Sequence, residues 1–180
     1  MKSAFYTLCG VFAVVVVGGL IFVFSGQYDV GADSPHWPIT RWLVHETMER
    51  SVEARAKDIA VPDNLNDPAR IAEGGQHYKE MCSECHMAPG LESSELRQGL
   101  NPMPPQLAKS AADMSPKEIF WVVKHGVKMT AMPAWGKTHD DQKIWAITAF
   151  VKYGLPGMTP SEYAAIKAES DDDEAPGGAE

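Results

Sequence analysis

The run Cys82-Ser83-Glu84-Cys85-His86 constrains this chain more than any other feature of its sequence. Two cysteines three positions apart lie on one side of a helical turn, where both can form thioether bonds with the two vinyl groups of a single haem. The histidine that follows the second cysteine then faces the iron as an axial ligand. The run therefore predicts one covalently bound haem c, attached through Cys82 and Cys85, with His86 as the first iron ligand.

Paired cysteines also serve two other chemistries. A thioredoxin-like thiol pair needs strand–helix–strand surroundings, and a zinc site needs two further cysteine or histidine ligands at matching spacing. Neither pattern accompanies residues 82–86, because the third cysteine, Cys9, lies in a distant apolar run and the other histidines are scattered. The sequence favours haem, with zinc and thiol redox chemistry as the weaker alternatives.

A haem with both axial positions filled needs a second ligand from later in the chain. Met132 lies in a loop between two predicted helices, 46 residues after the histidine of the motif, and its soft thioether suits ferrous iron. Met129, three residues earlier, is the rival ligand, and His125 is a more distant one. We expect Met103, in a proline-rich loop, only to line the pocket.

The chain opens with an apolar run from Leu8 to Phe24. At about 1.5 Å per residue, its 17 residues approach the lower limit for crossing a bilayer core of about 30 Å. A cleaved signal peptide is the alternative, but the length of the run favours an uncleaved anchor. Lys2 precedes the run and Asp29 follows it, so we expect the amino terminus in the cytoplasm and the rest outside. Residues 1–27 are thus predicted to be a transmembrane anchor or signal segment.

Three further regions follow the anchor, and none shows sustained strand alternation, so the predicted fold class is all-α. Few helix breakers interrupt residues 34–60, which predicts a stalk or linker helix within 28–67. The predicted haem domain spans 68–163 and holds three longer helices, over residues 69–81, 115–124 and 140–153. Residues 164–180 are predicted to be an acidic disordered tail, because six of the acidic groups lie within 169–180. The net charge of −8 excludes a general affinity for nucleic acid.

Residues 69–157 resemble the class I, single-haem cytochromes c in their membrane-anchored bacterial form. Gly74 and Tyr78 precede the first cysteine by eight and four positions, as the glycine and aromatic of the first helix do in that family. The resemblance also covers residues of the last helix, the proline loop and the ligand loop: Ile147, Ala149 and Phe150, Pro104-Pro105-Gln106-Leu107, and residues 128–133. It implies the class I cytochrome c fold, a Pro105 carbonyl that accepts a hydrogen bond from the haem histidine, and iron ligation by Met132. Ala131 departs from the family, in which many members have glycine there.

These features predict an electron-transfer protein rather than an enzyme, because both axial positions would be filled by the protein and no acid–base pair accompanies the motif. Trp121, Trp135 and Leu107 are expected to line an apolar haem pocket, although ordinary core packing explains each of them as well. The resemblance implies the bacterial inner membrane, with the haem domain in the periplasm. The implied partners are a membrane oxidase, reductase or dehydrogenase, which the chain would serve as a carrier or as a haem subunit. A haem peroxidase and a gas sensor are the alternatives.

Overall fold

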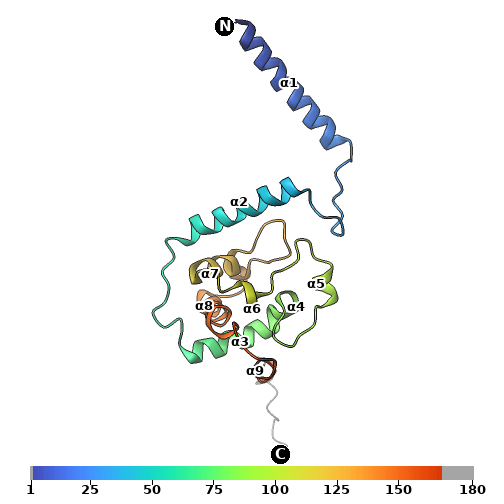
Figure 1. Ribbon diagram of the computed structural model, residues 1–180. Helices are drawn as coiled ribbons and strands as arrows, with labels where there is room; N and C mark the ends of the chain where they lie inside the picture. Colours follow the sequence, from blue (N-terminus) through green and yellow to red (C-terminus); the bar gives the residue numbers. More distant parts are fainter. Residues whose placement is uncertain (1, 168–180) are drawn as a thin grey trace, which may run out of the picture. The chain divides into compact units, whose positions relative to one another are not determined.

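The computed structural model describes residues 2–167. The regular elements in this range are all helices, joined by loops, and no strand occurs in it (Figure 1). This confirms the predicted all-α class. Most of the predicted acidic tail, residues 168–180, lies outside the described part. The chain divides into two compact units, one ending at Pro35 and one beginning at His36.

The first unit contains one helix, α1 (Lys2–Phe24), which includes the whole apolar run. Its side chains are exposed along its full length, so it buries nothing within the protein. Of the described helices, α1 alone is long and apolar enough to cross a membrane, a test that a signal sequence also passes. At about 1.5 Å per residue, its 23 residues span about 34 Å.

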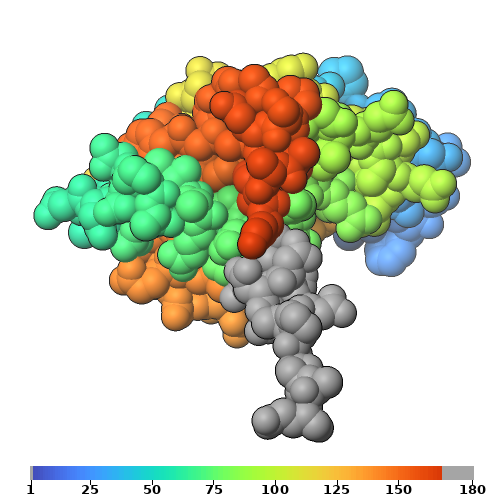
Figure 2. Space-filling view, turned by 90° about the horizontal axis from the view of Figure 1, so that it is seen from below, coloured from blue at the N-terminus to red at the C-terminus, as the bar shows by residue number. Residues whose placement is uncertain are grey.

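The second unit is built around the crossing of α3 (Pro68–Met81) and α8 (Asp141–Ala149), which continues as the wider helical turn η2 (Phe150–Gly154). The helices meet at Gly74, where a Cβ atom would lie 1.8 Å from the backbone oxygen of Ala146. Beside this contact the rings of Tyr78 and Phe150 pack with centroids 5.3 Å apart. Figure 2 shows the face where the orange-red C-terminal residues lie against α3.

The helix α7 (Pro116–His125) packs on α8 and begins where the sequence predicts. Ser115 and Glu118 form a capping box, in which each side chain bonds the backbone of the other residue. At the other end Gly126 has a φ of 65°, and a side chain there would meet the backbone of Met132 and Pro133. The end of α7 is therefore fixed directly against the segment that carries Met132.

The predicted stalk helix is α2 (Pro38–Ala56), and its second half belongs to the core. Val52 and Ala56 are buried, and α2 packs on α7. Trp37, Trp42 and Leu43, near its start, are more than half exposed. The packing of α2 on the domain is a feature that the sequence did not predict.

Short helices complete the second unit; the sequence predicted the helical turn of the cysteine motif, α4, and the others are too short to be predicted. They are α4 (Ser83–His86), α5 (Glu95–Gln98), α6 (Leu107–Ser110), η1 (Trp135–Lys137) and α9 (Pro160–Ala164). The core extends beyond α9, because the Ile166 side chain packs against the core. The Ile166 carbonyl also accepts a hydrogen bond from the Lys79 ammonium group.

Candidate haem-binding site

The cysteine motif forms one helical turn at the end of α3. The backbone N–H groups of Cys85 and His86 both donate to the Cys82 carbonyl, at 3.2 and 2.8 Å. The turn ends at Met87, whose φ is 63°, and the Tyr78 hydroxyl donates to the Met87 carbonyl at 2.5 Å. Because the aromatic residue on α3 fastens the end of the turn, the two thiols and the imidazole are held on one short, rigid segment.

The two cysteines are free thiols in different environments. Cys82 is buried and Cys85 is partly exposed. Burial, with a smaller contribution from Cys85, raises the pKa of the Cys82 thiol to about 12, so this group is neutral at physiological pH.

The imidazole of His86 is oriented by the proline loop. Its Nδ1 lies 3.0 Å from the carbonyl oxygen of Pro105. A carbonyl only accepts hydrogen bonds, so Nδ1 carries the proton and Nε2 keeps its lone pair for a metal. Burial lowers the pKa of the ring most strongly; the contact with Pro105 raises it, and the charge of Arg97 lowers it. The ring is therefore neutral at pH 7, as an iron ligand must be.

The two candidate methionine ligands differ sharply in their surroundings. Met132 is partly buried and packs against the core, whereas Met129 is 90% exposed, with a φ of 60°. The backbone N–H of Met132 donates to the Thr130 hydroxyl at 3.1 Å, and its carbonyl accepts from Val127 at 3.3 Å. The Thr130 hydroxyl in turn donates to the Val127 carbonyl at 2.8 Å. These bonds close residues 127–132 into a loop that has Met129 near its tip and Met132 at its base.

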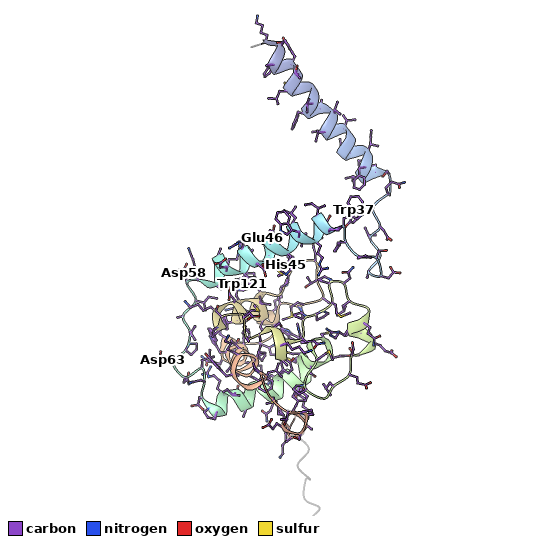
Figure 3. The ribbon with its side chains drawn as sticks, in the orientation of Figure 1. Trp37, His45, Glu46, Asp58, Asp63 and Trp121 are labelled. Atoms are coloured by element: carbon purple, nitrogen blue, oxygen red, sulfur yellow. The ribbon has the colours of Figure 1, made fainter. Side chains whose placement is uncertain are left out.

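The predicted pocket residues occupy two places. Leu107 and Trp135 are partly buried and pack against the core, and the Trp135 ring meets His139 edge-on at 5.3 Å. Trp121 lies on the side of the domain next to α2 (Figure 3), where it lines a groove of about 400 Å³ with Arg55 and other residues. Its ring also packs on His125, with centroids 4.9 Å apart. That these three residues contact haem stays a prediction.

The three lysines near the loop of residues 127–132 differ in their contacts and exposure. Lys124 pairs with Asp141 at 2.6 Å and lies over the Phe120 ring, so it belongs to the contact between α7 and α8. Lys128 and Lys137 are exposed. A positively charged rim around the loop would therefore rest on these two.

Two residues that matter at the site escaped the sequence prediction. Thr130 fastens the ligand loop, and Arg97 is a buried cation whose charge acts on His86. Thr130 had a weak signal, since a threonine two residues before a candidate ligand can bond the backbone locally. Arg97 had none, because only the tertiary structure buries it.

The donor set fits a haem c. It comprises two thiols on one turn, a neutral imidazole with Nε2 available, and a partly buried thioether on a fastened loop. A zinc site would need a different set, and within residues 2–167 no three His, Cys, Asp or Glu side chains lie close enough together to hold a metal ion.

Residues 69–151 match the family model described as cytochrome c oxidase, cbb3-type, subunit III. The matched segment includes both cysteines of the motif, His86, Pro105 and Met132. Neither the curated proteins nor the solved structures give a significant match.

Proposed function

Residues 69–151 form a c-type cytochrome domain, and from this premise we propose that the chain is a membrane-tethered, single-haem electron-transfer protein. It passes single electrons in a respiratory or periplasmic chain, as a carrier or as the haem subunit of a larger complex. The observation that carries the proposal is the bond of His86 Nδ1 to the Pro105 carbonyl, on the same short turn as Cys82 and Cys85. That bond presents Nε2 of a neutral ring, which is what an axial histidine requires.

Four residues would hold the group. Cys82 and Cys85 would be the attachment points, and His86 and Met132 would bind the iron. When bound, haem c supplies a one-electron iron couple, and a methionine opposite histidine raises its potential. Thr130 and Val127 keep the Met132 segment in place through backbone bonds. The exposure of Met129 supports Met132 as the ligand, because a side chain that is 90% exposed contributes almost nothing to a buried site.

On this proposal the chain is an electron-transfer protein rather than an enzyme, whether it acts as a carrier or as a subunit. Two protein ligands leave no open position for substrate, and electron transfer needs none. The proposed partners are redox proteins such as a membrane oxidase, reductase or dehydrogenase. The family match, which is named for an oxidase subunit, supports an oxidase among these.

Membrane tethering by α1 is the second part of the proposal. It is supported by the length and apolar character of α1 and by the absence of buried residues along it. Lys2 before the helix favours a cytoplasmic amino terminus, which supports a haem domain outside the cytoplasm, in the periplasm of a bacterium. Alkaline extraction of membranes tests this: the full chain stays in the pellet, and a fully soluble full-length product would contradict the anchor.

A reductive titration of the purified full chain tests the redox role. We expect reversible uptake of one electron per chain, and no carbon monoxide binding by the reduced protein, because both axial positions are filled. Tight carbon monoxide binding or rapid peroxide turnover by the native protein would favour a haem enzyme instead. A chain that takes up no electron would contradict the proposal.

A further inference from the structure

Four large apolar side chains are exposed near the start of α2. Ile39, Trp42, Leu43 and Val44 each have more than half of their surface exposed. Scattered exposed apolar residues are common in folded proteins, but four within six positions of one helix form a patch, which we call the α2 patch. A patch of this kind on a folded domain marks a surface that contacts a partner or a membrane.

The face of α2 that carries the patch changes from apolar to charged along the helix. Successive members of this face are spaced by four and three positions, which places their side chains on one side of the helix. In chain order they are Ile39, Leu43, Glu46, Arg50 and Glu53. The last three are joined as ion pairs, because Arg50 contacts Glu46 at 2.9 Å and Glu53 at 3.2 Å. The change occurs at Glu46 (Figure 3), so one end of the face suits an apolar environment and the other suits water.

The opposite side of α2 is joined to the rest of the domain. Val52 and Ala56 are buried there, and α2 packs on α7. The end of α7 is fixed in turn against the segment that carries Met132. Because α2 is one uninterrupted helix, the patch at its start keeps a fixed orientation relative to the candidate haem site.

The α2 patch follows α1 closely in the chain. Residues 25–37 separate Phe24, the last residue of α1, from α2. These 13 residues reach at most about 45 Å, and Asp29 shortens them by accepting hydrogen bonds from the Gly31 N–H group and the Ser34 hydroxyl. Since the proposed function places α1 in a membrane, α2 begins within that distance of the membrane surface. Tryptophan and aliphatic side chains favour the boundary between lipid and water.

We propose that the α2 patch is a membrane-contact surface, which lies in the interfacial region of the bilayer that holds α1. The inference rests on the proposed tethering by α1. Contact at the patch adds a second attachment to the anchor. Because α2 is packed on α7, this contact also sets the orientation of the haem domain relative to the bilayer, while the charged second half of the same face stays in water.

The experiment measures lipid contact by fluorescence quenching of the full-length holoprotein in phosphatidylcholine vesicles. A small environment-sensitive dye is attached to one thiol, and nitroxide-labelled phosphatidylcholine is the quencher. In the holoprotein Cys82 and Cys85 are bonded to haem, so Cys9→Ser removes the remaining thiol and Leu43→Cys sets the position of the dye. The matched control is Glu53→Cys, on the same face at its charged end and about 15 Å along the helix.

We expect several-fold stronger quenching at position 43 than at position 53. Nitroxides near the headgroup quench the dye at position 43 more strongly than nitroxides deep in the acyl chains do. Ile39→Cys, in the same patch, gives the same pattern and replaces Leu43→Cys if that variant does not fold. Quenching at the patch positions that is no stronger than at position 53 would overturn the inference.

Tethering by α1 is measured separately, with the dye on the natural Cys9, which lies within α1. We expect strong lipid quenching there. Strong quenching at Cys9 with none at position 43 would refute the membrane contact of α2 and leave the anchor intact. Absence of quenching at Cys9 would instead refute the proposed tethering, so the two failures are distinguishable.

Discussion

Two methionines three positions apart show how far environment decides the role of a residue. Met132 and Met129 share a side chain and a loop, but the hydrogen bonds of Thr130 and Val127 fix the backbone of the former, while the latter faces solvent. A thioether binds iron more tightly when less conformational entropy is lost on binding, and the hydrogen-bonded loop has lost much of that freedom already. This difference is the physical basis for assigning the ligand to Met132.

Exchange of each methionine for alanine tests that assignment. We expect Met132→Ala to admit carbon monoxide to the reduced protein and to destabilise it by about 2 kcal/mol, because a partly buried side chain is lost. Met129→Ala serves as the matched control and changes stability by less than about 0.5 kcal/mol, with no carbon monoxide binding. Absorption spectra under carbon monoxide and denaturant titrations measure both effects. The reverse pattern would reassign the ligand to Met129.

The residues of the site differed in how well the sequence could predict them. The cysteines and His86 are adjacent in the chain, so their chemistry is visible without a fold. The contact between His86 and Pro105 spans 19 residues, so it depends on the fold and local spacing does not reveal it. Arg97 could not be found in this way, because its burial and its hydrogen bond to the Pro104 carbonyl are tertiary properties.

At the scale of elements, the crossing of α3 and α8 orders the domain. Gly74 allows the two backbones to approach, since any side chain there would clash with the Ala146 carbonyl. The same helix α3 ends at the cysteine turn and carries Tyr78, which bonds Met87. The crossing therefore positions the motif relative to the rest of the core.

Gly74→Ala tests the crossing. Alanine is the better helix former by about 1 kcal/mol, so an isolated helix would gain from the change. In the folded protein we expect a net loss of about 3 kcal/mol, because the Cβ atom forces the two helices apart. The neighbouring change Glu73→Ala, at an exposed position of the same helix, shifts stability by less than about 0.5 kcal/mol. Thermal or denaturant unfolding followed by circular dichroism measures both, and equal stability of the two variants would refute the close contact.

The longer helices were predictable because their boundaries carry local signals. Ser115-Pro116 starts α7, Gly126 ends it, and Pro68 opens α3. The helices of four or five residues, such as α4 and α5, are too short to show a periodic pattern, and contacts with the rest of the chain hold them. The packing of α2 on α7 also escaped prediction, since Val52 and Ala56 are too few to mark a buried face.

At the scale of the whole molecule, the chain combines an apolar helix, α1, with a helical domain that contains the cysteine motif. The first was recognisable from composition alone, and the second from one motif and the loops that follow it. Six of the acidic groups fall in residues 169–180, so the rest of the chain is close to charge balance. A domain close to charge balance relies on local features, such as the exposed Lys128 and Lys137, for electrostatic recognition of a partner.

The central claim is that one haem is bonded covalently to this chain through Cys82 and Cys85. The most direct test is the mass and colour of the full-length protein after denaturation, produced in a host that attaches haem c to exported proteins. We predict a coloured polypeptide heavier than the bare chain by one haem, and a colourless chain of unmodified mass when both cysteines are replaced by alanine. A wild-type protein that loses all colour on denaturation and has the mass of the polypeptide alone would contradict the account.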